Sequence, residues 1–240
     1  MADYIIGDVH GDQVLWDACI SPMLKAGDRA FVLGDFGVGF WNGRYWSEEI
    51  FYDYLEQQPY TVCVIDGNHE DFNKLNSYPV EQWNGGQVHR IRKNVIHLMR
   101  GEIFELEGKT IFTFGGGYSY DCARRTEGYD WWPQEMPSQE EYHYAYQNLE
   151  KHDWKVDYIL THTCPSETIA YMSTMHLGVK DFAGGERELN LFFDYIRAET
   201  SYQKWYFGHF HVDRELWRSQ YAVLDAVRDL HTGKIIRYRS

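Results

Sequence analysis

Aspartate and histidine stand one residue apart near the start of the chain, as Asp8 and His10, directly after the apolar residues 4–6. Side chains at positions i and i+2 of a strand point to the same face, so both can reach one metal ion. Carboxylate and imidazole are both common metal ligands. Taken alone, the segment is also typical of a polar turn in which Asp12 caps the next helix.

The same arrangement recurs at four later apolar runs, residues 30–33, 61–65, 156–160 and 204–207, each of which ends in a polar turn. The polar residues at the five ends are Asp8, His10, Asp35, Asn68, His69, His162, His209 and His211. Five of the eleven histidines fall in these turns, which favours a shared site over isolated surface histidines. The other six lack this context and are interpreted as structural: His89, His97, His143, His152, His176 and His231.

All of these strand-end residues except His69 are candidate metal ligands. Seven ligands are too many for one ion and suit a pair. Two ions about 3.5–4 Å apart can activate a water and hold the oxygens of an ester. Asp35 lies on the strand expected between the others, and its two oxygens can reach different ions, so it is the candidate bridge.

The elements expected to position these residues alternate between strand and helix. Helices are expected at roughly residues 13–25, where Pro22 can bend the helix, and from residue 47 to before Pro59. The alternation predicts an α/β fold with a largely parallel sheet. Ligands of such sheets bind outside the carboxyl ends of the strands, so we expect the polar turns at one edge.

The middle of the chain has a different rhythm. Short strands are expected at residues 87–92, 95–99, 102–106 and 110–114, with a hairpin turn at 107–108. They suggest an antiparallel second sheet or an extension of the first sheet.

The remainder returns to helices and strands. A capping box opens an expected helix at 138–151, and a Gly-rich loop at 178–185 leads into another at 186–198. Strands at 221–224 and 235–237 close the chain. No linker interrupts the pattern, so residues 1–240 are predicted to form a single domain.

Composition restricts the partners and the compartment. The formal net charge of −13 argues against nonspecific binding of nucleic acid, although bound cations could still attract a small phosphate ester. The four cysteines include no C-x-x-C pair, which is typical of thiols in a reducing compartment. No signal peptide and no apolar stretch of the roughly 20 residues needed to span a bilayer is seen, so a soluble cytoplasmic protein is expected, without a membrane partner.

An insert at residues 119–139 is rich in aromatic and charged side chains and is expected to be ordered. Arg124 or Arg125 could bind a phosphate, and Trp131 or Trp132 could pack on the organic part of a substrate. The alternative is structural: the tryptophans hold the loop to the sheet, and the arginines pair with nearby acidic residues.

The ordered motifs resemble those of the calcineurin-like metallophosphoesterase superfamily. They read Gly-Asp8-x-His10, Gly34-Asp35, Gly67-Asn68-His69-Glu70, His162 and Gly208-His209-x-His211, and the resemblance extends from residue 4 to about 225. It implies a four-layer α/β/β/α sandwich of two mixed sheets, with a dinuclear metal site at the carboxyl ends of the strands. The ions would be Mn, Fe or Zn.

The resemblance also implies a role for each strand-end residue. One ion would be held by Asp8, His10 and His211, the other by Asn68, His162 and His209, with Asp35 bridging them. His69 resembles the proton donor of the family, which protonates the leaving oxygen or binds a phosphate oxygen. The nucleophile would be a metal-bound hydroxide.

Part of the family pattern is absent. Residues 36–40 read Phe-Gly-Val-Gly-Phe where the Ser/Thr protein phosphatases have Asp-Arg-Gly, and Asp71-Phe72 follow Glu70 in place of an arginine. A protein phosphatase is therefore disfavoured, and no residue is indicated to orient His69.

The function expected from the sequence is hydrolysis of phosphate mono- or diesters of small-molecule or nucleotide type. One alternative is a nuclease, against which the negative charge counts. The other is a metal-bound scaffold that binds a partner without turnover, against which the presence of His69 counts.

Overall fold

The computed structural model describes residues 1–40, 45–177 and 184–239, which form two mixed sheets and six helices. The first sheet has eight strands, in the spatial order β14 (Ile235–Tyr238), β13 (Ala226–Asp229), β1 (Asp3–Ile6), β2 (Arg29–Val32), β3 (Thr61–Val64), β6 (Val95–Leu98), β5 (Gly86–Arg92) and β4 (Val80–Trp83). The neighbours β1, β2, β3 and β6 are parallel. The prediction of an α/β protein is confirmed.

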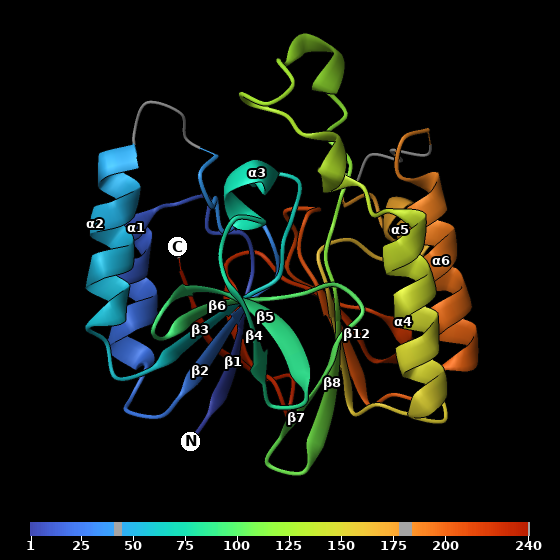
Figure 1. Ribbon diagram of the computed structural model, residues 1–240. Coiled ribbons are helices and arrows are strands. Elements are labelled where there is room, and N and C mark those ends of the chain that lie inside the picture. Colours follow the sequence, from blue (N-terminus) through green and yellow to red (C-terminus); the bar gives the residue numbers. More distant parts are fainter. Residues whose placement is uncertain (41–44, 178–183, 240) are drawn as a thin grey trace.

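The second sheet has six strands. Its spatial order is β11 (Arg214–Glu215), β12 (Gln220–Ala222), β10 (Lys204–Phe207), β9 (Tyr158–Thr161), β8 (Lys109–Phe114) and β7 (Ile103–Leu106). The helices are α1 (Gln13–Leu15), α2 (Tyr45–Glu56), α3 (Phe72–Leu75), α4 (Gln139–Lys151), α5 (Ser166–Thr174) and α6 (Arg187–Glu199). Figure 1 shows α1 and α2 on one side of the molecule and α4, α5 and α6 on the other, with both sheets between them.

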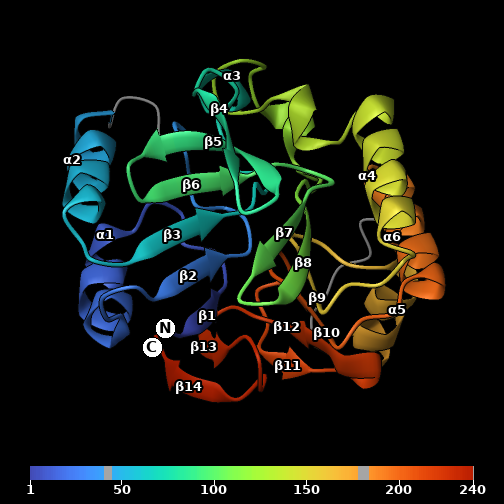
Figure 2. The same ribbon diagram turned by 60° about the horizontal axis from the view of Figure 1, so that its bottom comes forward.

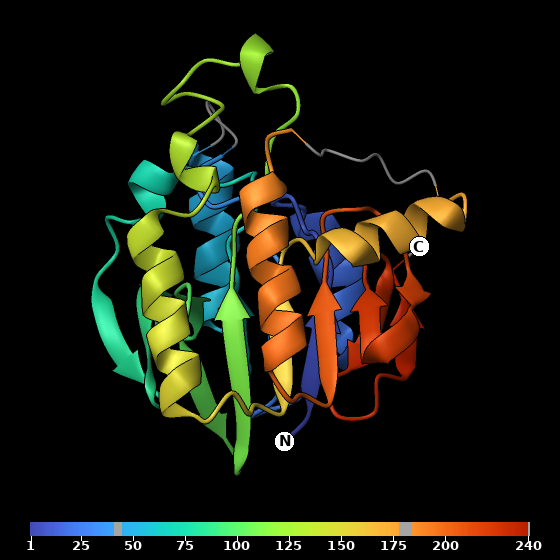
Figure 3. The same ribbon diagram turned by 90° about the vertical axis from the view of Figure 1, so that its right-hand side faces the viewer.

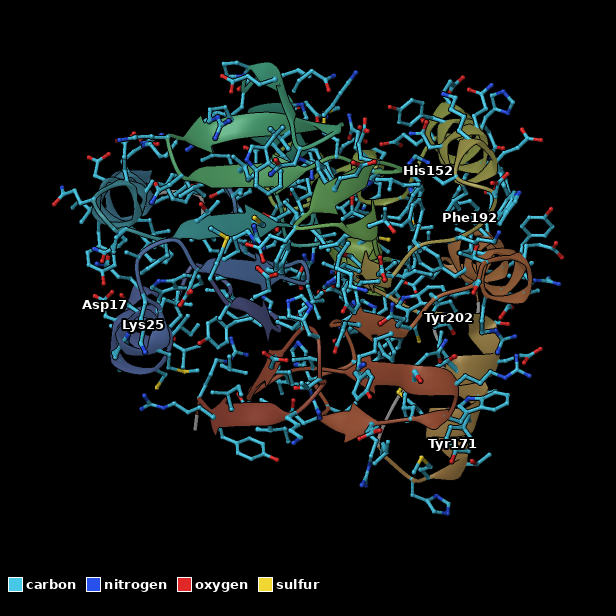
Figure 4. All side chains as sticks on the ribbon, turned by 90° about the horizontal axis from the view of Figure 1, so that it is seen from below. Asp17, Lys25, His152, Tyr171, Phe192 and Tyr202 are labelled. Carbon is cyan, nitrogen blue, oxygen red and sulfur yellow. The ribbon has the colours of Figure 1, made fainter. Side chains whose placement is uncertain are left out.

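Both faces of the first sheet are buried along its parallel strands β1, β2, β3 and β6, as their continuous apolar sequences require. Ile6 and Val32 face the helices α1 and α2, whereas Ile5 and Phe31 belong to the core shared with Ile111 and other residues of the second sheet. Figures 2 and 4 show the two sheets between the helices, with Asp17 and Lys25 on one helical side and Phe192 and Tyr171 on the other.

The helix expected at 13–25 is divided. Asp12 caps it, because its side chain accepts the N–H of Leu15, but the α-helical turn gives way to a π-helical turn at Trp16–Ile20 and a 3-10 turn at Ser21–Met23. Pro22 has no N–H to continue the ladder. The second predicted helix, α2, begins at Tyr45, two residues early, and α4 has the expected capping box.

The short middle strands are divided between the two sheets. β5 pairs with β6 in antiparallel fashion and extends the first sheet, whereas β7 and β8 form an edge hairpin of the second. The hairpin turn at Glu107 and Gly108 has positive φ at both residues (52° and 77°), as a tight hairpin requires. The four middle strands therefore do not form one antiparallel sheet: β6 also pairs with β3 in parallel fashion, and β8 pairs with β9 in parallel fashion.

Several elements had no clear sequence signal: α3, α5, β4, β11 and β13. Residues 178–183 of the Gly-rich loop expected at 178–185 lie outside the described residues. No helix among the described residues is long and apolar enough to cross a membrane. In Figure 3 the arrowheads of β8 and β10 point toward the insert, so the carboxyl ends of these strands and the insert share one edge of the molecule.

Candidate metal centre

The strand-end residues come together from both sheets. Asp8 and His10 follow β1, Asp35 follows β2, and Asn68 and His69 follow β3 in the first sheet. From the second sheet, His162 follows β9, and His209 and His211 follow β10. We call these eight residues the strand-end cluster. Its members are brought together because the carboxyl ends of the parallel strands meet at one edge.

One possible ligand group contains Asp8, His10 and His211, whose ligand atoms lie within 4.8 Å of one another. Oδ2 of Asp8 is 3.2 Å from Nε2 of His211. Asp8 is buried, whereas 58% of the His211 side chain is exposed, so this group is the more open part of the cluster. Burial opposes the charge of Asp8, but the hydrogen bond from His211 and the charge of His162 hold the Asp8 pKa below its ordinary value.

A second set of donors surrounds His162. Its Nε2 is 3.1 Å from Oδ1 of Asn68, 3.2 Å from Nδ1 of His209 and 3.5 Å from Oδ1 of Asp35. All four side chains are buried or nearly so. This set corresponds to the ligands expected for the second ion.

The tautomer of His162 tests whether these residues fit a cation. Nδ1 of His162 is 2.7 Å from the carbonyl oxygen of Leu33, which can only accept, so Nδ1 carries the proton. In the neutral ring Nε2 is then an acceptor, and it faces the oxygens of Asn68 and Asp35, which are acceptors too. A positive charge between these atoms stabilises such an arrangement, although Nδ1 of His209, 3.2 Å from Nε2, can also donate to that nitrogen. This set of ligand atoms therefore fits a metal ion. When no metal ion is bound, a proton on Nε2 of His162 can supply the positive charge instead.

Electrostatics agree with this interpretation. Burial opposes protonation of His162, but the charges of Asp35 and Asp8 outweigh it and raise the pKa of His162. Burial likewise opposes ionisation of Asp35, but His162 and three further histidines hold the pKa of Asp35 far below its ordinary value. Burial lowers the pKa of His209. The centre thus holds ionised carboxylates that are ready to bind a cation.

Four members of the cluster have left-handed backbone conformations. The φ angles are 53° at His10, 48° at Asp35, 64° at His209 and 53° at His211. Positive φ is uncommon in residues other than glycine and costs on the order of 1–3 kcal/mol each where it is strained. Such conformations concentrate at functional sites, because the turn directs the side chain to a position that a relaxed strand end would not reach.

The glycines that precede two of the ligands allow the close approach. A Cβ on Gly34 would lie 2.1 Å from Nδ1 of His162, and a Cβ on Gly67 would lie 2.1 Å from Oδ1 of Asp35. Glycine is therefore needed before Asp35 and before Asn68, because atoms of His162 and Asp35 occupy the space that a side chain would fill.

His69 is a half-buried member of the cluster. Its ring centroid is 4.7 Å from that of Phe40 and 5.3 Å from that of His10, and its backbone N–H donates to Oδ1 of Asp35 at 2.8 Å. These contacts orient a residue for which the sequence indicated no partner. Its ligand atoms also fall within 4.8 Å of those of His10 and Asp35, a second possible ligand group that was not expected. Burial lowers the pKa of His69, against the charge of Asp35, which raises it.

Glu70 holds the backbone that follows Asp35. This fully buried carboxyl group accepts the backbone N–H groups of Phe36, Gly37 and Val38, the residues that follow Asp35. Burial and the charge of Asp35 raise the pKa of Glu70, whereas the backbone hydrogen bonds lower it. Glu70 belongs to the Gly-Asn-His-Glu motif, so its presence was visible in the sequence, but its supporting role was not.

Glu186 is a second supporting carboxylate, and no motif indicated it. It is fully buried, accepts hydrogen bonds from Thr163 and Asn190, and places Oε1 3.5 Å from Nε2 of His209. Carboxylates in this position orient metal-binding histidines and raise their basicity. It stands at the start of α6, more than twenty residues from any ligand in sequence.

The insert lies beside the cluster. Arg125 forms an ion pair with Asp121 at 2.9 Å and lies 5.7 Å above the ring of Phe40, whereas Arg124 is exposed. Trp132 is buried in the core next to Phe40, as the structural alternative expects. Trp131 is half-buried. Phosphate contact by either arginine stays a prediction.

Comparison with known proteins adds no relative. No protein-family model matches the chain, and a search of curated proteins finds no similar sequence. The functional interpretation therefore rests on the geometry of the strand-end cluster and on the motifs that carry it.

Proposed function

We propose that this protein is a metal-dependent phosphoesterase that hydrolyses phosphate mono- or diesters of small-molecule or nucleotide type. The main support is that accepting atoms of Asp35, Asn68 and His162 face one another beside the group formed by Asp8, His10 and His211. The order of helices and sheets agrees with the four-layer α/β/β/α sandwich of the calcineurin-like metallophosphoesterases, with the ligands at the carboxyl ends of the strands.

Each residue has a role in this proposal. One ion would be held by Asp8, His10 and His211, the other by Asn68, His162 and His209, with Asp35 between them. Nitrogen and oxygen ligands of this kind suit Mn, Fe or Zn. When bound, such ions would act as Lewis acids on the phosphoryl oxygens and lower the pKa of a water molecule.

His69 would supply the proton for the leaving ester oxygen. Its half-buried ring lies beside His10 and Phe40, next to the proposed ions, where it could reach the leaving oxygen of a bound ester. Phe40 and the backbone hydrogen bond to Asp35 hold the ring in this orientation. The charge of Arg125 contributes to lowering the pKa of His69, so Arg125 lies within electrostatic range of that ring and is a better candidate for phosphate contact than Arg124.

A cavity of about 600 Å³ provides space for the organic part of the substrate. It adjoins Asp8 and His10 and is lined further by Phe36, Tyr52 and Arg239. The volume falls within the roughly 300–1,000 Å³ of ordinary small-molecule sites. A small ester or a nucleotide would fit in this volume.

The proposal is tested with chromogenic esters. After removal of metals by a chelator, hydrolysis of p-nitrophenyl phosphate and bis(p-nitrophenyl) phosphate should be absent, and Mn²⁺, Zn²⁺ or Fe²⁺ should restore it. His69→Ala should lower kcat by roughly 10²–10⁴-fold, the usual contribution of general acid catalysis. Asp35→Asn should abolish turnover, because the central charge of the cluster is removed.

The matched control is His143→Ala, since His143 is exposed on α4 on the far side of the second sheet. It should leave kcat and KM unchanged. A wild-type protein that binds metal but hydrolyses neither ester with any of these ions would contradict the proposal and favour a metal-bound scaffold.

A further inference from the structure

The insert contacts the metal centre through a chain of buried hydrogen bonds. Nδ2 of Asn68 donates to Oγ of Ser119 at 3.0 Å, and Oγ of Ser119 donates to Oε2 of Glu135 at 2.7 Å. The backbone N–H of Ser119 donates to Oε1 of the same carboxyl group at 2.8 Å. Ser119 and Glu135 are each 1% exposed and Asn68 is 6% exposed, so water does not compete for these bonds.

The chain has a fixed direction. An ionised carboxylate can only accept, so the single hydroxyl proton of Ser119 goes to Glu135 and Oγ must accept from Asn68. The NH₂ group of Asn68 therefore faces Ser119, and its carbonyl oxygen faces Nε2 of His162 at 3.1 Å. Only the carbonyl oxygen can bind a cation, so an amide turned by 180° would present hydrogen atoms to the ion.

We propose that Ser119 and Glu135 are positioning residues, which hold the amide of Asn68 with its oxygen toward the second ion. This inference rests on the proposed function, in which Asn68 is a ligand of that ion. It gives the insert a role that does not require contact with substrate. Such partners of metal ligands commonly change metal affinity by about 10–100-fold when they are removed.

The two residues are themselves held in place. The backbone carbonyl of Glu135 accepts hydrogen bonds from the N–H of Gly117 at 3.1 Å and from Nη2 of Arg100 at 3.3 Å. Burial raises the pKa of Glu135 to about 7, against the hydrogen bonds from Ser119, which lower it. At pH 8 the carboxyl group is ionised and accepts both bonds.

Two variants separate direction from shape. Ser119→Ala removes the acceptor for the NH₂ group of Asn68. Glu135→Gln keeps the shape of the side chain, but its amide nitrogen donates to Oγ of Ser119, whose proton then points to Asn68 and favours the turned amide. Glu127→Gln, at an exposed carboxylate of the same insert, is the matched control.

Metal binding is measured at pH 8 by titration of the metal-free full-length protein with Co²⁺, followed by the absorbance of the bound ion and by equilibrium dialysis. The wild type and Glu127→Gln should bind two ions. In Ser119→Ala and Glu135→Gln the first ion should bind as in the wild type, and the second about 10–100-fold more weakly. Thermal unfolding of the metal-free variants checks that they are folded.

The failures of the two proposals are distinguishable. Two ions bound with wild-type affinity by both Ser119→Ala and Glu135→Gln would overturn this inference alone. A wild-type protein that binds no second ion would overturn it together with the proposed function.

Discussion

Histidine rings gather in two regions of this molecule, and Asn68 of one region is only two residues from Asp66 of the other. In the strand-end cluster, the accepting atoms of His162, Asn68 and Asp35 face one another. The second region contains His89 and His97, whose rings are stacked with their centroids 5.2 Å apart and their Nδ1 atoms 2.9 Å apart. Both regions adjoin the end of β3, yet they are built in opposite ways.

The second region is a chain in which donors and acceptors alternate. Nε2 of His97 is 2.9 Å from Oδ1 of Asp66, and Arg100 donates to Oδ2 of Asp66 through Nε at 2.9 Å and Nη2 at 2.6 Å. Asp66 is an acceptor only, so His97 carries its proton on Nε2 and accepts from His89. We call these four residues the hydrogen-bonded cluster.

The comparison teaches that the number of buried histidines does not identify a metal site. In the hydrogen-bonded cluster the atoms satisfy one another, and a cation gains nothing by entering. In the strand-end cluster three accepting atoms face one another once His162 is neutral, and although Nδ1 of His209 can donate to one of them, a cation satisfies all three. The direction of the lone pairs, which the neighbouring groups set, distinguishes the two.

The largest expected effect concerns the charges of the hydrogen-bonded cluster. Arg100→Met leaves the carboxylate of Asp66 buried without its cation, which typically costs about 3–5 kcal/mol of the free energy of unfolding. Arg100 and His97 hold the pKa of Asp66 below its ordinary value against burial, so the wild type keeps this contribution above about pH 4 and loses it as the pH falls further. Urea unfolding at pH 7 measures the loss.

Arg90→Met is the matched control for this substitution. Arg90 forms an ion pair with Glu81, but their side chains are 24% and 45% exposed. Surface pairs of this kind contribute at most about 1 kcal/mol. Equal destabilisation by the two variants would mean that the charges of Asp66 and Arg100 do not stabilise the hydrogen-bonded cluster. It would contradict the contrast drawn between the two clusters.

The second effect separates the two clusters by their response to a cation. Mn²⁺ at 100 times its Kd should raise the free energy of unfolding of the wild type by about 2.7 kcal/mol, since it binds only the folded state. His89→Gln should show the same increase, and Asp35→Asn should show a smaller one, because the central charge of the cluster is removed. The measurement is thermal or urea unfolding with and without Mn²⁺ after treatment with a chelator. Undiminished stabilisation in Asp35→Asn would place the cation away from Asp35.

The strands and their ligands were predictable because the signals are local. Each strand that carries a ligand is an apolar run, and each ligand lies within four residues of the end of its strand. Gly34 and Gly67 report directly on the close approach of His162 and Asp35. The pairing of strands in the middle of the chain was less predictable, because β6 and β8 each have a parallel neighbour that lies far away in sequence.

The supporting residues could not be predicted, because their partners are remote. Nδ1 of His162 donates to Leu33, 129 residues away, and Asn68 donates to Ser119, 51 residues away. Glu186 reaches His209 from the start of another helix. Nothing in the local sequence distinguishes these residues from ordinary polar ones. The interpretation of His89 and His97 as structural agrees with their hydrogen-bonded chain, although the chain itself was not foreseen.

The smallest of the three effects is the pH dependence that His89 of the hydrogen-bonded cluster contributes to stability. Burial, and then the neighbouring His97, lower the pKa of His89 to about 4, whereas an exposed histidine in the unfolded chain titrates near 6.5. Between these values the unfolded state binds a proton that folded His89 does not bind. The contribution to stability is therefore complete above about pH 6.5 and is lost as the pH falls toward 4.

His89→Gln should remove this dependence, since the amide can still donate to Nδ1 of His97 but does not titrate. The difference in free energy of unfolding between wild type and variant should change by roughly 2 kcal/mol from pH 7 to pH 4.5, after allowance for residual solvent screening of His89. Urea unfolding of the metal-free proteins at half-unit intervals measures it, and the exposed His143→Gln serves as control. The strand-end histidines are present in both proteins, so their contributions cancel in the difference. Parallel stability profiles for wild type and His89→Gln would contradict the prediction, because they would show that His89 titrates in the folded state as it does in the unfolded chain. The hydrogen-bonded cluster would then not be closed to solvent, and this contrast with the metal centre would be lost.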